Sequence, residues 1–280
     1  MSERVIEVIK ADGTRENFDL AKLTESLRNS GATEEVATSV AEHVGQELVS
    51  GMTTDDIYRH AFSVLRAREK KASVRYSLRR SLLALGPTGF PFEKLVGEIY
   101  RRKGFSVQID QIVQGKCVDH EMDIVAWNME KLIMAEAKYH HELAYKSDLK
   151  VVLYVKARFD DLYASSFTYG TERKLDEGWL ITNTKFTEKA IRYAECSGMR
   201  LLGWNYPENM NLHDLIDETG VHPITCLTTL TDSQKQLLMD QGVVLCESVR
   251  DQKGKLKSLG FDDRHIGDVE AESAVLCPVA

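Results

Sequence analysis

The sequence has little of what marks a membrane, exported or disulfide-stabilised protein. No uninterrupted apolar run reaches the ~18 residues of a membrane span, and the first residues, Met1 to Val5, contain no apolar signal core. The five cysteines are scattered and include no Cys-x-x-Cys pair, so neither a cysteine zinc motif nor a disulfide framework is indicated. We therefore expect a cytoplasmic protein with reduced thiols and no membrane partner.

An excess of positive charge is also missing. The net charge is −7, from 36 basic and 43 acidic residues. Residues 208–280 hold the whole excess, with 6 basic and 13 acidic residues, whereas residues 1–85 and 90–207 are balanced at 13 of each and 17 of each. The acidic net charge therefore does not argue against DNA binding by the first two segments. No Gly-x-x-x-x-Gly-Lys motif occurs, which excludes a hydrolysing motor of the P-loop class.

Turn and periodicity signals divide the chain into three parts and predict an α/β multidomain protein. Residues 1–85 read as a small β-hairpin followed by about four helices. The stretch Gly86-Pro87-Thr88-Gly89 marks the boundary. The patterns in residues 86–207 predict a helix, three strands and then helix–strand–helix–strand, with residues 105–109 as the first strand and residues 145–161 as one long helix. This order predicts a mixed β-sheet flanked by helices. Residues 208–280 read as a helical C-terminal extension.

Two carboxylates and a lysine lie on a predicted β-hairpin in the second part. The apolar runs Ile124–Trp127 and Leu132–Ala135 are separated by a short polar turn. Asp123 precedes the first run, and Glu136 and Lys138 follow the second, two apart and so on one face. Carboxylates are hard oxygen ligands suited to Mg²⁺, and a metal beside a lysine suits phosphodiester hydrolysis. The alternative is three solvated charges on an exposed face.

Neighbouring residues add candidates whose roles the sequence leaves open. Glu121 shares strand parity with Asp123, so we expect Glu121 closer to the metal than His120. Three roles remain open for His120: a metal ligand, a general base, or a loop histidine with a structural role. His140 and His141 directly follow Lys138-Tyr139 and either have a structural role or contact a phosphate backbone.

The order of motifs around this hairpin resembles the PD-(D/E)XK nuclease superfamily, above all the Mrr-like restriction endonucleases and the archaeal Holliday-junction resolvases. The resemblance covers roughly residues 88–207, from the helix beginning Phe92-Glu93-Lys94 to the strand Leu201-Leu202-Gly203-Trp204. It implies two metal ligands, a catalytic lysine and a helix glutamate that completes the metal site: Asp123, Glu136, Lys138 and Glu93. The sequence departs from the family at His120-Glu121, where Mrr proteins usually have glycines.

Residues 3 to about 83 resemble an ATP-cone, the nucleotide-sensing domain of ribonucleotide reductases and their repressor. The resemblance lies in residues 8–13 with 18–23, 54–58 and 72–80. It implies ATP or dATP as a regulatory ligand, with the lysines on its phosphates and the following residues around it: Val8, Lys10, Glu16, Asp19, Lys22 and Thr54. The family usually has arginine where this chain has Ala11.

These observations predict a DNA endonuclease that depends on Mg²⁺ or Mn²⁺ and is regulated by ATP or dATP. We expect DNA and nucleotide as partners, and a homo-oligomer. The alternative is a non-cleaving, ATP-sensing regulator that binds DNA. The complete Asp–Glu–Lys set favours the nuclease, because a domain that had lost cleavage would be free to lose one member.

Overall fold

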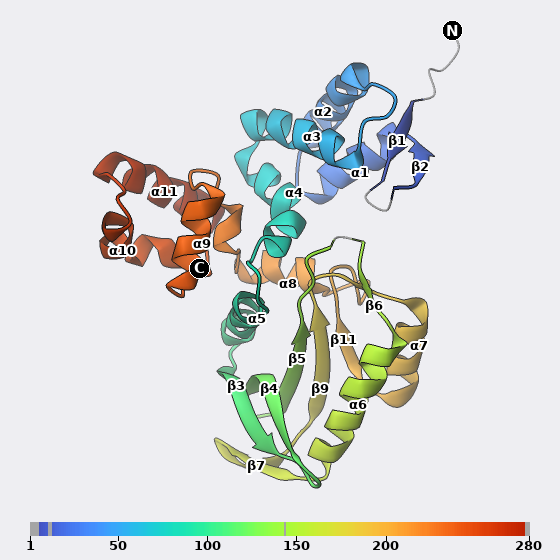
Figure 1. The fold of residues 1–280 in the computed structure, drawn as a ribbon, viewed down its shortest axis with the longest axis vertical. Helices are drawn as coiled ribbons and strands as arrows, with labels where there is room; N and C mark the ends of the chain where they lie inside the picture. Colours follow the sequence, from blue (N-terminus) through green and yellow to red (C-terminus); the bar gives the residue numbers. More distant parts are fainter. Residues whose placement is uncertain (1–5, 11–12, 143, 278–280) are drawn as a thin grey trace. The chain divides into compact units, whose positions relative to one another are not determined.

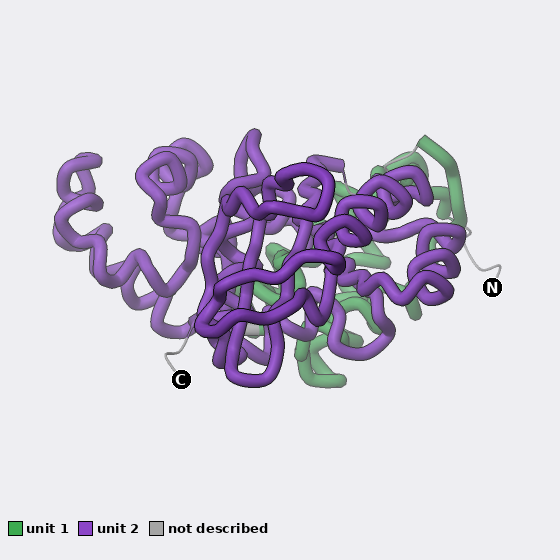
Figure 2. The backbone as a smooth tube through the Cα atoms, turned by 90° about the horizontal axis from the view of Figure 1, so that it is seen from below, with its two compact units in different colours: residues 1–78 green, residues 79–280 purple. Residues whose placement is uncertain are grey.

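The computed structural model describes residues 6–10, 13–142 and 144–277. The chain divides into two compact units, unit 1 (residues 1–78) and unit 2 (residues 79–280), which Figure 2 colours separately. Helix α4 (Lys70–Leu83) runs across the division. Within the described ranges, no helix combines the length and the apolar character needed to cross a membrane.

Unit 1 begins with an antiparallel hairpin and continues with helices: β1 (Glu7–Ile9), β2 (Arg15–Asn17), α1 (Leu20–Asn29), α2 (Glu34–Glu47), α3 (Thr54–Arg68) and the first part of α4. The Asp19 carboxylate accepts hydrogen bonds from the backbone of Ala21 and Lys22 and so starts α1. Thr53 and Asp56 form a capping box at the start of α3. The hairpin followed by helices is confirmed.

A mixed five-stranded sheet organises unit 2 (Figure 1), in the order β11-β9-β5-β4-β3. Its strands are β3 (Ser106–Gln114), β4 (Asp119–Trp127), β5 (Leu132–Lys138), β9 (Glu177–Thr182) and β11 (Arg200–Leu202). Strands β3, β4 and β5 are joined antiparallel, whereas β9 pairs parallel with β5 and β11 pairs parallel with β9. The predicted mixed sheet is therefore confirmed.

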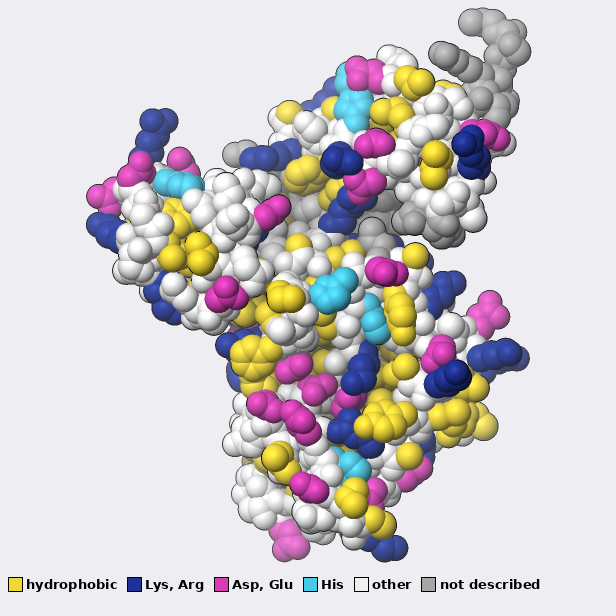
Figure 3. All heavy atoms as spheres, viewed as in Figure 1, with side chains coloured by type: hydrophobic (Ala, Val, Ile, Leu, Met, Phe, Trp, Pro, Cys, Tyr) yellow, Lys and Arg dark blue, Asp and Glu magenta, His cyan; other side chains and the backbone are white. Residues whose placement is uncertain are grey.

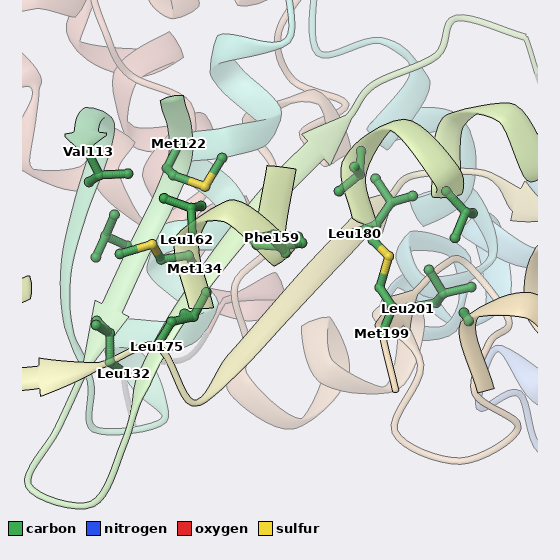
Figure 4. Close-up of a cluster of buried hydrophobic side chains, with 14 of the residues drawn as sticks. Val113, Met122, Leu132, Met134, Phe159, Leu162, Leu175, Leu180, Met199 and Leu201 are labelled. Carbon is green, nitrogen blue, oxygen red and sulfur yellow. The ribbon is translucent and has the colours of Figure 1, made fainter. Parts of the chain in front are cut away.

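Helices flank this sheet: α5 (Phe90–Arg102), α6 (Leu149–Tyr163) and α7 (Glu188–Ser197). Helix α5 packs against β3 and β4. Phe159 and Leu162 of α6 are buried in a cluster with Met134 and Leu180 of the sheet (Figure 4). A Cβ atom on Gly178 would lie 2.6–2.8 Å from the Phe159 ring. Glycine at this position therefore lets α6 approach β9 closely.

The predicted long helix over residues 145–161 is wrong at its beginning. Lys146–Ser147 form strand β6, which pairs parallel with β10 (Lys185–Phe186), and α6 starts only at Leu149. The start is set by Asp148, whose carboxylate caps the first turn. A second hairpin, β7 (Ser166–Tyr169) with β8 (Thr171–Lys174), follows α6 and was not predicted.

The last part of unit 2 is helical, as predicted. It contains α8 (Leu212–Thr219), η1 (Ile224–Cys226), α9 (Asp232–Asp240), η2 (Glu247–Asp251), α10 (Lys253–Ser258) and α11 (Asp263–Leu276). Thr231 and Gln234 form a capping box that starts α9. All five cysteines carry free thiols, and three of them, Cys226, Cys246 and Cys277, are buried.

Candidate nuclease active site

The β4–β5 hairpin brings the two predicted metal ligands side by side. Ile124 pairs with Ala135 across the strands, so the preceding Asp123 and the following Glu136 lie at the same level. The Asp123 carboxylate accepts a hydrogen bond of 2.6 Å from the Ala137 backbone N–H of the neighbouring strand. The acid is thereby fixed directly to the strand that carries Glu136 and Lys138.

Glu136 is buried, with only 4% of its surface exposed, and two cations contact it. Lys138 Nζ lies 2.5 Å from one carboxylate oxygen, and Arg158 of α6 donates to the other. Arg158 also donates to the backbone carbonyl of Glu121. Because Arg158 comes from α6, Glu136 faces the α6 side of the sheet. The two ion pairs offset the cost of removing the carboxylate from water.

A pocket of about 420 Å³ opens at this point. Its lining comes from β4, β5 and α6: Asp119, His120, Glu121, Asp123, Glu136, Lys138, Tyr154 and Arg158. Figure 3 shows acidic side chains gathered beside Lys and Arg on the face of unit 2 over strands β3 to β5. The pocket therefore offers several carboxylate ligands and two cations to one bound group.

Burial, together with the crowding of carboxylates, raises the pKa values of two acids in this region. Burial, and then the nearby Glu136 charge, raise the pKa of Asp123 to about 6, although the Ala137 N–H and the neighbouring cations act in the opposite direction. Burial, and then the charge of Asp123, raise the pKa of Glu93 to about 7. A divalent cation would relieve this repulsion, so the donor set fits Mg²⁺ or Mn²⁺.

Glu93 and Asp110 extend the carboxylate cluster from the neighbouring elements. Glu93 lies in the first turn of α5, and its pKa responds to the charges of Asp123, Asp110, Glu121 and Glu136. Asp110 was not predicted as a site residue, because the predicted strand ends at residue 109 whereas β3 continues to Gln114. Asp110 has a left-handed φ of 56°, a conformation that aspartate tolerates better than most residues.

Glu121 and His120 both line the pocket, so the structure brings both open candidates to the site. His120 Nε2 lies 2.9 Å from Asp161 Oδ2 of α6, and both side chains are largely buried. The hydrogen bond to His120 is the main cause that lowers the pKa of Asp161 to about 2. Asp161 also accepts from the backbone of Cys117 and Val118. The dyad therefore fixes the start of β4 on α6.

His140 and His141 lie outside the residues that line the pocket. The His140 ring stacks on Tyr145 with a centroid distance of 3.8 Å, and its backbone exchanges hydrogen bonds with the Asn183 side chain. The His141 ring contacts Tyr139 edge-on. Their contacts within the protein support the structural alternative.

Arg158 and Tyr154 are pocket residues that the sequence analysis did not identify. They are four residues apart on α6, so they share one helix face, and the Arg158 guanidinium lies 5.8 Å from the Tyr154 ring centroid. The i, i+4 spacing was visible in the sequence. The sequence did not indicate that this face of α6 lies over the hairpin that carries Asp123 and Glu136.

In unit 1 the predicted nucleotide residues gather around the hairpin. Lys10 and Glu16 form an exposed ion pair of 3.3 Å, and Val8, which pairs with Glu16 across the strands, is buried. Ile9 forms a parallel bridge with Thr53, which brings the hairpin beside Thr54 at the start of α3.

Asp19 and Lys22 occupy the beginning of α1. The Asp19 carboxylate accepts from the Lys22 backbone N–H at 3.3 Å, and the Lys22 side chain is exposed. A helix start near exposed ammonium groups attracts anions. Ala11, the predicted departure from the ATP-cone pattern, lies outside the described residues.

Comparison with protein families assigns each part of the chain. The ATP cone domain matches residues 6–83, the restriction endonuclease (Mrr catalytic) domain matches residues 86–205, and the AF1548-like C-terminal domain matches residues 222–277. The protein is thus an ATP-cone protein with a restriction-endonuclease-like domain, and the resemblance drawn from the sequence is confirmed.

The chain also resembles individual proteins in sequence and in structure. The chain is 34% identical over 179 residues to an uncharacterized protein of Archaeoglobus fulgidus (strain ATCC 49558 / DSM 4304 / JCM 9628 / NBRC 100126 / VC-16), covering 64% of this chain and 97% of that protein. The chain therefore belongs to the same family as that protein. The crystal structure of the protein of unknown function AF1548 is 31% identical, with a TM-score of 0.55 over 68% of this chain and 98% of that one.

Proposed function

We propose that the protein is a DNA endonuclease that depends on Mg²⁺ or Mn²⁺ and is regulated by ATP or dATP. The observation that carries this proposal is the convergence of Asp123, Glu136 and Lys138 in one pocket. Asp123 and Glu136 would hold the metal, together with the nearby carboxylates of Glu93 and Glu121. A bound divalent metal lowers the pKa of a water molecule and neutralises charge on the phosphate.

The protein's own cations would act on the open side of this pocket. The Lys138 side chain keeps 37% of its surface exposed, although its ammonium touches the buried Glu136. It is therefore held in place and still accessible to a phosphate, where it would stabilise the developing negative charge or orient the attacking water. Arg158 keeps Glu136 aligned from the α6 side.

The nucleotide would act through binding rather than hydrolysis. We place the nucleotide-binding part in residues 1–85, the nuclease part in residues 86–207 and the helical extension in residues 208–280. The absence of a P-loop motif from the sequence supports a regulatory ligand. Nucleotide near Lys10 and Lys22 would change the assembly of a homo-oligomer or the access of DNA.

A plasmid-nicking assay tests the proposal. Supercoiled DNA is incubated with the full chain in Mg²⁺, Mn²⁺ or EDTA, each with and without ATP and dATP. We expect nicked or linear DNA in the metal-containing reactions, none in EDTA, and a rate that depends on nucleotide. DNA binding without cleavage under every condition would instead support the non-cleaving regulator.

A further inference from the structure

We propose that unit 1 contains a binding site for a divalent transition metal, built from His43 and Glu47 of α2 and His60 of α3. One donor atom from each side chain lies within 4.8 Å of the other two. Figure 3 shows histidine side chains of unit 1 together at the surface, with an acidic side chain beside them. The site is separate from the carboxylate pocket of unit 2 and does not depend on the proposed nuclease function.

The two histidine–carboxylate distances are close to the separation of neighbouring donors at a tetrahedral metal ion, and they run to the two oxygens of Glu47. His43 Nε2 lies 3.5 Å from Glu47 Oε1, and His60 Nε2 lies 3.3 Å from Glu47 Oε2. Metal–ligand bonds of about 2.1 Å at a tetrahedral zinc ion separate neighbouring donors by about 3.4 Å. The two imidazole centroids are 5.4 Å apart with their planes at 72°, and the Nε2 atoms of both rings lie beside the same carboxylate.

Local structure explains why the three side chains meet. His43 and Glu47 are four residues apart, which places them on one face of α2. Helices α2 and α3 pack against each other, and His60 lies in the middle of α3. His60 is the least exposed of the three, at 25%, whereas Glu47 keeps 57% exposed. The site is thus partly preformed and open to an entering ion.

The donor set selects the class of metal. Two imidazole nitrogens and one carboxylate suit Zn²⁺, Co²⁺ or Ni²⁺, whereas Mg²⁺ prefers an all-oxygen environment. Three protein ligands leave a fourth position for water. Zn²⁺ is therefore the expected occupant, and the Mg²⁺ proposed for unit 2 is not expected to compete for it.

A simple ion-pair cluster is the competing explanation, and its pH dependence is opposite. An ion pair of histidine with glutamate needs protonated imidazole, but a metal needs neutral imidazole. Zinc affinity should therefore increase as the pH rises, whereas a histidine–carboxylate ion pair becomes weaker.

A zinc ion bound to His43, Glu47 and His60 would link α2 to α3. Thr54, one of the predicted nucleotide residues, begins α3 six residues before His60, about 9 Å along the helix. Fixing α3 on α2 by a metal would therefore act on an element that also carries part of the nucleotide site. Zinc should raise the melting temperature of unit 1 in the full chain, because a ligand that binds the folded state stabilises it.

The test is a zinc titration of the full chain against a chromophoric chelator, with excess Mg²⁺ present to occupy the carboxylate pocket. The wild type should bind one tight equivalent. His60→Ala and the milder Glu47→Gln should each weaken affinity by more than the roughly 10- to 100-fold that loss of an outer-shell partner costs. His213→Ala, a partly exposed histidine of α8, is the matched control and should leave affinity unchanged.

Chemical labelling of single histidines is the second part of the test. Zinc should protect both His43 and His60 from carbethoxylation, measured by peptide mass spectrometry, while the labelling of His213 stays constant. Circular dichroism verifies that each variant is folded. If His60→Ala does not fold, the zinc affinity of Glu47→Gln provides the test. Zinc affinity that neither variant changes, or labelling of both histidines that zinc does not alter, would overturn the proposal.

Discussion

The charged residues of the two units differ in how far they are removed from water. In unit 1 the Lys10–Glu16 pair keeps 45% and 37% of its side-chain surface exposed. In unit 2 Glu136 is almost completely buried between Lys138 and Arg158. An exposed pair contributes little to stability and is easily exchanged for a ligand. A buried set is costly to assemble, strongly oriented and sensitive to every partner.

The difference suits the two proposed tasks. A regulatory nucleotide must bind and leave, so its phosphates are best met by solvated cations near a helix start. Bond cleavage needs charges that are already oriented where new charge develops. The predictions below test this comparison, from the largest expected effect to the smallest.

Removing the buried charge of Glu136 should have the largest effect. Glu136→Gln keeps the side-chain volume but leaves Arg158 and Lys138 without their shared anion and removes a proposed metal ligand. We expect plasmid cleavage to fall by at least about 10³-fold, on the scale of other key site substitutions. Glu130→Gln, in the exposed turn of the same hairpin, is the control and should cleave like the wild type.

Loosening the packing of α6 on the sheet should have the second largest effect, a loss of stability. Gly178→Ala places a methyl group against the Phe159 ring, so α6, which carries Arg158, must move. We expect a loss of about 1–3 kcal/mol in the free energy of unfolding, measured in urea. Gly254→Ala on α10, with open space at its Cβ position, is the matched control; an equal loss there would refute the packing explanation.

The carboxylate pocket should also give unit 2 an unusual pH dependence in EDTA. The folded-state pKa of Asp123 is raised to about 6, so the folded protein binds more protons than the unfolded chain between about pH 4 and pH 6. This contribution is present below the ordinary carboxyl pKa and is lost as the pH rises through 6. We expect a decrease on the order of 3 kcal/mol.

Urea denaturation at several pH values would measure this decrease, and Asp123→Asn should flatten the profile over the same range. Glu93, whose pKa is raised to about 7, extends the decrease toward neutral pH. Added Mg²⁺ should restore stability most strongly at the upper end, where the ligands are deprotonated. A profile that Asp123→Asn leaves unchanged would contradict the assignment.

The exposed cations of unit 1 should show the smallest effect. Lys10→Ala should weaken ATP binding by roughly tenfold, the range of one charge-assisted phosphate contact, with almost no change in stability because the ion pair is exposed. Arg15→Ala removes the neighbouring exposed pair with Glu7 and serves as control. Isothermal titration calorimetry measures the ATP affinity of each variant. Equal affinity for Lys10→Ala and the wild type would exclude Lys10 from the nucleotide site.

Locally encoded features were predictable from the sequence. Asp19 starts α1, and Thr53 with Asp56 starts α3, because a helix cap depends on residues within one turn. The hairpin that carries Asp123 and Glu136 was predictable because two apolar runs flank a polar turn. These features need no information from distant parts of the chain.

Features that depend on distant contacts were not predictable. The β6–β10 pair joins residues about forty positions apart, and no local signal marks two-residue strands. Arg158 became a site residue only because α6 packs over β5, which its own sequence does not state. Asp110 was missed because the strand continues through its left-handed backbone. The sequence thus indicated the acids and the lysine of the hairpin but not the residues that orient them.

The most direct test separates metal binding from cleavage in Lys138→Ala. Mn²⁺ binding, followed by electron paramagnetic resonance, and single-turnover DNA cleavage are measured on the same samples, with Lys131→Ala of the same hairpin as control. The proposed roles predict that Lys138→Ala retains Mn²⁺ binding and loses cleavage by at least about 100-fold, while Lys131→Ala retains both. Cleavage by Lys138→Ala at the wild-type rate would contradict the assignment of this pocket as the active site.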